Sequence, residues 1–363
     1  MPTTITTQLF FDGADVLGPS ALTLDENGVI SSVDRYSGTC DHYLVTPGLV
    51  DVQMNGWDDV DVAEADGDSL LRLDEALFAL GTSHWLGTIV TAPLDRMQDR
   101  LARLDSIHGS RRVAGFEGVH MEGPFLGGAP GAHNRRHIVP IDPGMVASLP
   151  RSVRLVTLAP EAAGASDAIE TLVSRGVCVS AGHSTPSRSQ FDDAVSAGVT
   201  MVTHLFNGMS GVHHRDGGMA LWSMLDERIT LGLVADGHHV SADAVALAFR
   251  VAADRVCLVS DSVAWAADRA TTRGVRSKDG VAVLGDGTLA GSCTPLAGCV
   301  RWAVSVAGVP LHAALRAATR TPALVIGAED LGLVRVGRPA DLTFFDESLH
   351  ATGGVRRLAS PRG

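Results

Sequence analysis

The stretch VAGFEGVHMEGPF (residues 113–125) shows the pattern that decides the fold: a short apolar run followed by residues able to bind a metal ion. Its apolar part, 113–119, is too short for a helix and leads directly to His120 and Glu122. Seven other runs have the same character and also lead to polar residues. In chain order, the eight runs are 49–54, 88–92, 113–119, 154–158, 177–179, 199–202, 229–234 and 256–259.

Stretches with apolar residues at helical spacing separate these runs, for example 70–80 and 192–197. Strands that alternate with helices predict a parallel sheet, and eight such units predict an α/β protein with a closed (β/α)8, TIM-like barrel. In that fold the residues just after the strands share one mouth, so side chains far apart in sequence meet there. An open doubly wound sheet is the alternative, but no Gly-x-Gly-x-x-Gly motif opens a first helix.

The two ends of the chain have a different texture from the middle. The chain has 363 residues, more than the roughly 250 of a bare barrel, so a second small module is expected. Asn27-Gly28 is a hairpin signal near the start. Strand-like segments occur near both ends, at 4–11, 21–24, 29–33 and 341–345. We therefore predict that 1–47 and 337–363 pair as a small β-sandwich domain beside a barrel of residues 48–336.

Composition limits the classes of partner. A net charge of -12 argues against a nucleic-acid or acidic-membrane surface, so any bound anion needs a local pocket. The N-terminus lacks a basic segment with a long apolar core, and no stretch reaches the roughly 20 apolar residues that span a bilayer. We expect a cytoplasmic protein without a membrane partner. The five cysteines include no C-x-x-C pair, so neither a disulfide framework nor a structural zinc motif is indicated.

The lysine usage excludes two mechanisms. Lys278 is the only lysine among 29 basic residues, and it lies in a turn-like stretch. A lysine-bridged metal pair or a Schiff base on a barrel strand is therefore excluded.

A carboxylate and two imidazoles follow predicted strands at the same end of the barrel. Glu122 follows the third run, His183 the fifth and His204 the sixth. Two histidines and one carboxylate, with a fourth position open for water, are the usual catalytic set for Zn²⁺, although Fe²⁺ and Co²⁺ accept the same ligands. A single strand-end histidine is more often structural, but three such residues together predict a metal site.

Asp261 directly follows the eighth run and has two interpretations. Beside a metal site, an aspartate can take a proton from the attacking water and deliver it to a departing amine. The other interpretation is a helix N-cap, which Asp261-Ser262 would also fit.

These residues lie in motifs through which the chain resembles the N-acetylglucosamine-6-phosphate deacetylase family of the amidohydrolase superfamily, over nearly its whole length. The matching motifs are PGLVDVQMNG (47–56), HMEGPF (120–125), GAHN (131–134), GHS (182–184), THLFNGM (203–209), ADGHHV (235–240), LVSD (258–261), LAGS (289–292) and GRPADL (337–342). So many matches in the same order make chance an inadequate explanation.

The resemblance implies hydrolysis of the acetamide of N-acetyl-D-glucosamine 6-phosphate to D-glucosamine 6-phosphate and acetate. It implies that Glu122, His183 and His204 hold one divalent metal per subunit, Zn²⁺ before Fe²⁺, Co²⁺ or Mn²⁺, and that Asp261 is the acid and base. It also implies a homodimer, since phosphate-contacting groups in the family can come from a neighbouring subunit. The implied substrate contacts are Ala132, His133, Asn207, Gly208, Arg215, His239, Leu289, Ala290 and Gly291.

Three of these substrate contacts leave alternatives open. The planar guanidinium of Arg215 suits a phosphate, which it can bind in a bidentate way, but a solvated loop arginine fits the sequence equally well. His133 and His239 are suited either to polarising the acetyl carbonyl or to holding sugar hydroxyls, and the sequence does not separate these tasks.

The chain departs from the family pattern in three places. Gln53 and Asn55 stand where many amidohydrolases have the His-x-His that binds a second metal, so we expect a single-metal site. The loop 127–131 is glycine-rich and lacks a lysine often found there, which favours a mobile lid over a plain surface loop. Gly208 follows Asn207 where alanine is more usual, a small change.

Three other functions compete with this interpretation. A related enzyme could act on another N-acetylated sugar phosphate, such as the galactosamine epimer, or on an acylated amino acid. Arg215 favours a phosphorylated substrate, but nothing separates the two sugar epimers. A non-enzymatic scaffold should have lost at least one residue of the metal and acid-base set, and all of them are present.

Overall fold

The centre of the molecule is an eight-stranded parallel sheet. The structure is a computed structural model that describes residues 2–267, 274–278 and 280–356. The sheet follows the chain order, as the runs predicted. Its strands are β6 (Leu49–Met54), β9 (Thr82–Val90), β10 (Phe116–Glu122), β11 (Val153–Leu158), β12 (Cys178–Ala181), β13 (Met201–Val202), β14 (Thr230–Leu233) and β15 (Val256–Leu258). Each overlaps one predicted run, so the TIM-like barrel is confirmed.

The first and last strands meet just beyond their ends. The backbone N–H of Asp261 donates to Gln53 O at 3.0 Å, and that of Asn55 donates to Ser262 O at 2.9 Å. The barrel is therefore closed by hydrogen bonds of Asn55 and Asp261, residues that the sequence predicted to lie at the mouth.

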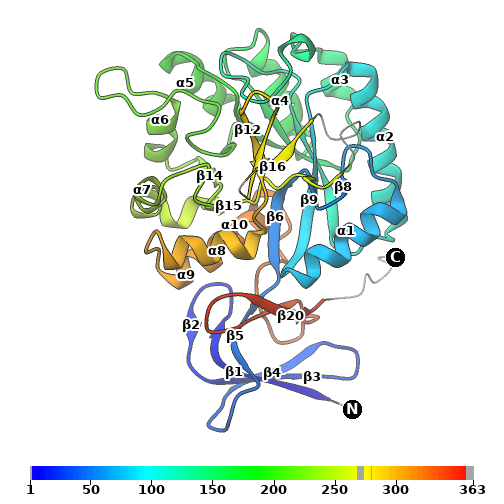
Figure 1. Ribbon diagram of the computed structural model, residues 1–363, viewed down its shortest axis with the longest axis vertical. Helices are drawn as coiled ribbons and strands as arrows, with labels where there is room; N and C mark the ends of the chain where they lie inside the picture. The colour runs from blue at the N-terminus through cyan, green and yellow to red at the C-terminus, as the bar shows by residue number, and fades with distance from the viewer. Residues whose placement is uncertain (1, 268–273, 279, 357–363) are drawn as a thin grey trace.

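Helices surround the barrel strands (Figure 1). They are α1 (Gly67–Ala79), α2 (Leu94–Ser110), α3 (Pro143–Ser148), α4 (Ala165–Ser174), α5 (Arg188–Ala197), α6 (Met219–Leu225), α7 (Ala242–Ala252), α8 (Leu296–Ser305), α9 (Leu311–Ala318) and α10 (Arg320–Val325), with 3-10 turns at Arg135–His137 and Ala253–Arg255. Local signals set their limits: α5 begins in a capping box of Ser187 and Gln190 and ends at Gly198, whose φ of 120° disfavours other residues. Among the described residues, none of the helices has the length and apolar character needed to cross a membrane.

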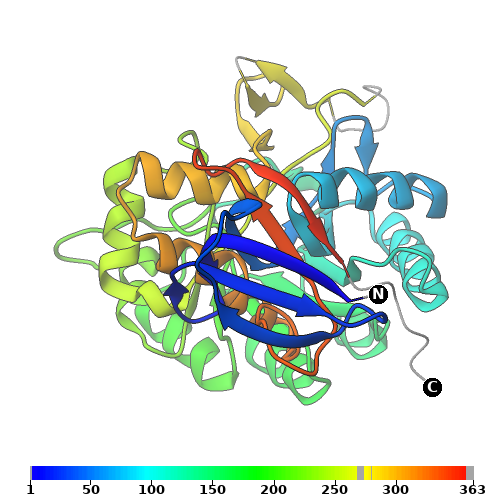
Figure 2. The same cartoon turned by 90° about the horizontal axis from the view of Figure 1, so that it is seen from below.

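The two ends of the chain pair with each other, as predicted. Within the described residues they form one seven-stranded mixed sheet, rather than the two packed sheets of the expected β-sandwich, in the order β20-β19-β5-β1-β3-β4, with β2 paired to β1. The strands are β1 (Thr3–Phe11), β2 (Val16–Leu17), β3 (Ser20–Leu24), β4 (Ile30–Arg35), β5 (His42–Pro47), β19 (Leu342–Phe345) and β20 (Ala351–Val355). Figure 1 shows this sheet below the barrel, and Figure 2 shows it from below. The division at 47/48 and 336/337 stays a prediction, and 357–363 lie outside the described residues.

A small antiparallel sheet was not predicted. It consists of β16 (Arg276–Lys278), β17 (Val281–Val283) and β18 (Leu289–Ser292), and a further hairpin joins β7 (Gly56–Trp57) to β8 (Val60–Asp61). Figure 2 shows the β16–β18 sheet, in yellow, standing out from the barrel. Lys278 lies exposed on β16, away from the barrel strands. We call β16–β18 the flap, because β18 borders the cavity described below.

A buried polar belt crosses the barrel interior next to the mouth. The His120 ring contacts Thr88 Oγ1 at 3.2 Å through Nδ1 and Thr157 Oγ1 at 2.8 Å through Nε2. Thr157 Oγ1 lies 2.7 Å from Thr203 Oγ1. Burial lowers the pKa of His120 to about 4, so its ring is neutral. This strand-end histidine therefore belongs to the packed interior, and it positions the strands that carry Glu122 and His204.

Candidate active site

Three residues at the barrel mouth have unusual backbone conformations. His183, His204 and Asp261 follow β12, β13 and β15, with φ of 50°, 31° and 48°. Non-glycine residues rarely adopt positive φ, and such positions collect at functional sites. The backbone thus turns sharply after each of these strands, at a residue whose side chain borders the central cavity.

The three predicted metal ligands meet at one point. Oε1 of Glu122 lies 2.9 Å from His183 Nε2 and 3.1 Å from His204 Nε2, and the two Nε2 atoms are 3.1 Å apart. All three side chains are almost fully buried. The predicted convergence of Glu122, His183 and His204 is therefore present in the fold.

The hydrogen bonds of the two rings show that they suit a cation. Nδ1 of His183 lies 3.1 Å from Ala129 O, and Nδ1 of His204 lies 3.1 Å from Asn207 O. A carbonyl only accepts, so each Nδ1 carries a proton, and in the neutral ring that binds a metal the lone pair lies on Nε2. Two lone pairs and a carboxylate oxygen this close repel one another unless a cation lies among them. Ligands held about 2.0–2.2 Å from a tetrahedral Zn²⁺ are roughly 3.3 Å apart, close to the spacing here.

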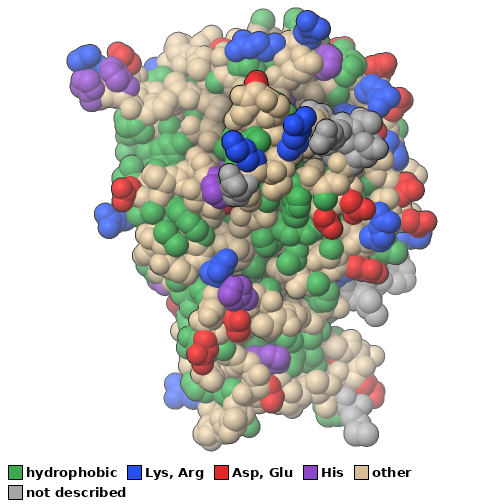
Figure 3. Space-filling model, viewed as in Figure 1, with side chains coloured by type: hydrophobic (Ala, Val, Ile, Leu, Met, Phe, Trp, Pro, Cys, Tyr) green, Lys and Arg blue, Asp and Glu red, His purple; other side chains and the backbone are tan. Residues whose placement is uncertain are grey.

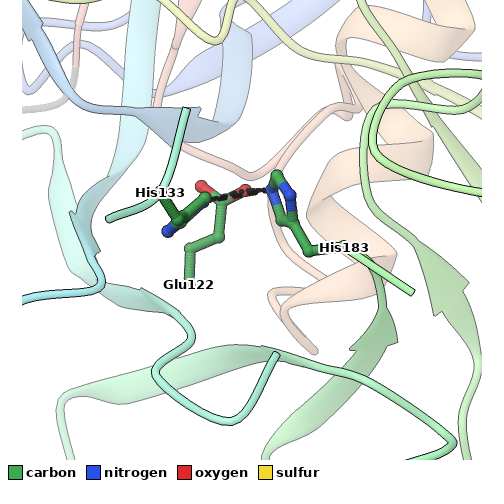
Figure 4. Close-up of side chains that lie close together, drawn as sticks. All are labelled: Glu122, His133 and His183. Atoms are coloured by element: carbon green, nitrogen blue, oxygen red, sulfur yellow. Dashed lines mark hydrogen bonds and ion pairs between the residues drawn. The ribbon is translucent and has the colours of Figure 1, made fainter. Parts of the chain in front are cut away.

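His133 adds a third imidazole to the group (Figure 4). Its Nε2 lies 3.1 Å from His183 Nε2 and 3.7 Å from Glu122 Oε1, while its Nδ1 lies 2.9 Å from Thr91 Oγ1. Glu122, His133 and His183 form a buried group able to hold a metal ion. His133, expected as a substrate contact, therefore lies directly beside the predicted metal ligands.

Glu122 keeps its negative charge in this setting. Burial alone would raise its pKa, but close polar contacts with the rings of His133, His183 and His204 outweigh burial and lower the pKa of Glu122 well below its usual value. A carboxylate, rather than a carboxylic acid, is the form that binds a divalent ion.

Asp261 borders the same cavity, and one of its carboxylate oxygens is fixed. Its Oδ1 accepts from Asn55 Nδ2 at 2.8 Å and from Gln53 Nε2 at 3.1 Å. Burial, together with the charge of Glu122, raises the pKa of Asp261. The alternative that Asp261 caps a helix is wrong, because residues 262–266 are not helical. Oδ2 is the carboxylate oxygen that Asn55 and Gln53 leave available for proton transfer.

Gln53 occupies the space between the two carboxylates. Its Nε2 donates to Asp261 Oδ1 and lies 3.5 Å from Glu122 Oε2. An amide N–H that points at both carboxylates takes the place where a second cation would neutralise them. The geometry agrees with the single-metal site expected from Gln53 and Asn55.

Nearly all the predicted site residues line one cavity of about 240 Å³. It is lined by Glu122, Ala132, His133, His183, His204, Asn207, Gly208, His239, Asp261, Leu289, Ala290 and Gly291, with Asn55, Val90, Gly131 and Thr288 in addition. Arg215 is the exception among the predicted residues. It is exposed on the loop before α6, and Figure 3 shows a projection of basic, acidic and histidine side chains where Figure 1 draws that loop.

Sequence reasoning assigned no role to Glu161, which ties the glycine-rich loop to a metal ligand. Its Oε1 accepts from the backbone N–H groups of Gly128 at 2.9 Å and Thr185 at 2.8 Å, and its Oε2 accepts from Ser184 Oγ. The position of Glu161 just after a strand end was the available signal.

The same loop contacts His183 directly. The N–H of Gly127 donates to His183 O at 2.9 Å, and the carbonyl of Ala129 accepts from the His183 ring. A Cβ at Gly128 would overlap Thr185 Oγ1, so a larger residue there would displace the Thr185 side chain. The loop therefore holds the ring of a predicted metal ligand in place. Its motion as a lid stays a prediction.

A parallel barrel with a carboxylate and imidazoles converging at its mouth defines the class of metal-dependent hydrolases. The family model described as the amidohydrolase family matches residues 44–360. The chain belongs to this family, whose members depend on a metal ion.

Within the family, the chain is similar to deacetylases of amino-sugar phosphates. It is 33% identical to N-acetylglucosamine-6-phosphate deacetylase of Bos taurus, over 94% of this chain and 88% of that protein. It is 32% identical to the Vibrio furnissii enzyme of the same name, over 89% and 86%. It is also 33% identical to N-acetylgalactosamine-6-phosphate deacetylase of Escherichia coli, over 89% and 90%.

A solved structure agrees with these matches. The crystal structure of N-acetylglucosamine-6-phosphate deacetylase from Pasteurella multocida superposes with a TM-score of 0.88, 28% identity and 98% coverage of each chain.

Proposed function

We propose that this protein hydrolyses the acetamide of N-acetyl-D-glucosamine 6-phosphate, giving D-glucosamine 6-phosphate and acetate. The observation that carries the proposal is the convergence of Glu122, His183 and His204 with Asp261 in one cavity. Deacetylases of this name resemble the chain over nearly its whole length. The resemblance supports the substrate, and the site supports the type of reaction.

Each residue of the site has its own role in the proposed reaction. When bound by Glu122, His183 and His204, a divalent ion supplies Lewis acidity and lowers the pKa of water at the site. Asp261 keeps Oδ1 in two hydrogen bonds, so Oδ2 accepts the proton of the attacking water. The same oxygen then gives the proton to the amine nitrogen as the C–N bond breaks. His133, beside the metal ligands, is placed to contact the acetyl oxygen.

Zn²⁺ is the metal we propose. Two neutral imidazoles and one carboxylate form a usual catalytic set for this ion, and Fe²⁺, Co²⁺ and Mn²⁺ are the alternatives. Metal content of the purified protein, together with activity after each ion is added to metal-free protein, separates them.

Acetate release from N-acetylglucosamine 6-phosphate is the direct test. The assay is run on purified protein, after chelation, and after Zn²⁺, Fe²⁺, Co²⁺ or Mn²⁺ is restored. Turnover that disappears with the chelator and returns with a metal supports the proposal. No turnover with any of these ions would rule out this substrate.

A second candidate is the galactosamine epimer of the same substrate. The similarity to the Escherichia coli N-acetylgalactosamine-6-phosphate deacetylase, at 33% identity, favours it over other N-acyl compounds. Comparing kcat/KM for the two epimers in one assay decides between them, because the epimers differ in the orientation of one hydroxyl group.

We also propose that the enzyme is a homodimer in which Arg215 serves the partner's cavity. Arg215 is exposed on a projecting loop and does not line the cavity of its own chain. A guanidinium on such a loop is suited to binding the substrate phosphate from a second subunit. R215A should raise KM with little change in kcat.

Mixing two impaired chains, assayed at a substrate concentration below the KM of R215A, tests the shared site. In a mixed dimer of R215A and D261N, one cavity contains Asp261 from one chain and faces Arg215 from the other. Recovery of activity on mixing supports the proposal. A monomeric mass by light scattering, or an R215A variant with wild-type KM, contradicts it and leaves Arg215 a solvated loop residue.

A further inference from the structure

The carboxylate of Asp236, just after β14, accepts hydrogen bonds on both oxygens. Its Oδ1 accepts from the backbone N–H groups of His238 and His239, both at 2.9 Å. Its Oδ2 lies 2.8 Å from His239 Nδ1 and accepts from Ser292 Oγ at 2.8 Å. The side chain of Asp236 is only 2% exposed, so these contacts are shielded from water. The arrangement fixes a single orientation of the carboxylate.

Asp236 is ionised in this setting. Burial alone would raise its pKa, but hydrogen bonds from the ring and backbone of His239 outweigh burial and lower the pKa of Asp236. An ionised carboxylate is an acceptor only. His239 Nδ1 must therefore carry a proton.

The other ring nitrogen then faces the reactive side of the cavity. His239 lines the cavity, and its Nε2 lies 3.7 Å from Asp261 Oδ2, the oxygen that Gln53 and Asn55 leave unbound. With the proton fixed on Nδ1, Nε2 is the ring atom offered to a ligand beside the acid-base residue.

We propose that Asp236 is a positioning residue for the hydrolytic reaction: it fixes the His239 proton on Nδ1 and directs Nε2 into the cavity beside Asp261. The role in the reaction rests on the function proposed above. The position of the proton on the His239 ring does not rest on that function, because it follows from the hydrogen bonds of Asp236 alone.

Ser292 connects Asp236 to the flap. It lies on β18, the strand that carries the cavity-lining Leu289, Ala290 and Gly291. Its N–H donates to Asp261 O at 2.8 Å, and its hydroxyl donates to Asp236. Asp236 thus holds His239 and β18 with the same oxygen, so the flap strand and the ring keep a fixed relationship.

The substitution D236N reverses the tautomer of His239. The amide oxygen must stay with the two backbone N–H groups, because they are donors. The amide NH₂ then faces His239 Nδ1, which has to become the acceptor, and the ring proton moves to Nε2. If Asp236 only shaped the turn, D236N would leave the His239 tautomer unchanged, because the amide oxygen still accepts from the two backbone N–H groups.

The test reads the ring directly by ¹⁵N NMR of histidine-labelled protein without substrate. The chain has 14 histidines, and H239Q identifies the signals of His239 by their loss. We expect a protonated Nδ1 in the wild type and a neutral Nε2–H tautomer in D236N, with kcat/KM reduced by roughly 10²-fold. S292A should keep the wild-type tautomer, and D243N, at an exposed position on α7, should change neither quantity.

Three results would overturn the inference. One is a wild-type His239 without a proton on Nδ1, which needs no variant to fold. The second is a folded D236N that keeps the wild-type tautomer, and the third is a reversed tautomer with unchanged kcat/KM. Absence of turnover in the wild type would instead refute the proposed function, because the tautomer is read without substrate.

Discussion

His84 Nε2 lies 2.6 Å from Asp341 Oδ2, and this contact joins a barrel strand to the segment leading into β19. The other ring nitrogen, Nδ1, lies 2.8 Å from Glu117 Oε1 on β10. The His84 side chain is 8% exposed, so an imidazolium is held between two carboxylates away from water. A buried charged group in this position connects the barrel to the terminal sheet.

Because of this contact, the free energy of unfolding should fall at alkaline pH. Burial alone would lower the pKa of His84, but Asp341 and Glu117 outweigh it and raise the pKa to about 10 from 6.5. A raised folded-state pKa contributes stability that is complete below pH 6.5 and is lost as pH rises through about 10. Urea unfolding of the wild type and H84Q should therefore differ by about 3–5 kcal/mol at pH 6 and by much less above pH 10.

The exposed pair of Arg316 and Asp254 is the control for this comparison. R316Q removes a solvent-screened contact and should change the unfolding free energy little at either pH. Equal differences between the wild type and H84Q at both pH values would contradict the assignment of a charged His84.

Loss of one metal ligand should abolish stabilisation by metal without unfolding the protein. H204N suits this test, because His204 has a φ of 31° and asparagine tolerates the left-handed region. Metal at about 100 times its Kd should stabilise the wild type by about 2.7 kcal/mol and leave H204N unchanged. Thermal unfolding with and without Zn²⁺ measures this, and equal shifts in both proteins would exclude His204 as a ligand.

Removal of the acid-base group should affect turnover and spare metal binding. D261N keeps an acceptor for Asn55 and Gln53 and also tolerates the φ of 48° at this position. We expect kcat to fall by roughly 10²–10⁴-fold. Zn²⁺ affinity from chelator competition should stay within a few-fold of the wild type. A variant with normal kcat would exclude Asp261 as the acid and base.

Glu161 should control metal affinity through the glycine-rich loop. E161A leaves the N–H groups of Gly128 and Thr185 without their acceptor and frees the loop that holds the His183 ring. Loss of such outer contacts costs roughly 10–100-fold in metal affinity. Chelator competition measures the affinity, and amide hydrogen exchange in 127–131 should become faster.

Two variants make the Glu161 result specific. E161Q retains an oxygen for the backbone donors and should recover most of the affinity. E170A removes an exposed glutamate on α4 and should match the wild type. If E161A bound metal normally while exchange in the loop became faster, the loop would not support His183.

Short-range patterns were sufficient to predict the barrel. Each parallel strand is buried on both faces, so it gives a largely apolar run such as 256–259, and the polar residues after the runs lie at one end of the sheet. This geometry is why Glu122, His183, His204 and Asp261 could be placed together from the sequence. The flap was missed because β16, β17 and β18 have only three or four residues each and β16 is entirely polar.

The sequence by itself determined which strand ends contribute to the mouth, because strand order in a parallel barrel follows chain order. Only the tertiary structure decided the direction of each side chain, which depends on partners distant in the chain. It put Arg215 on an exposed loop away from its own cavity. It also paired Asp236 with Ser292 across 56 positions of sequence and gave His183 a positive φ. Hydrogen bonds between distant segments and local backbone strain leave no periodic pattern, so they emerge only when the chain is folded.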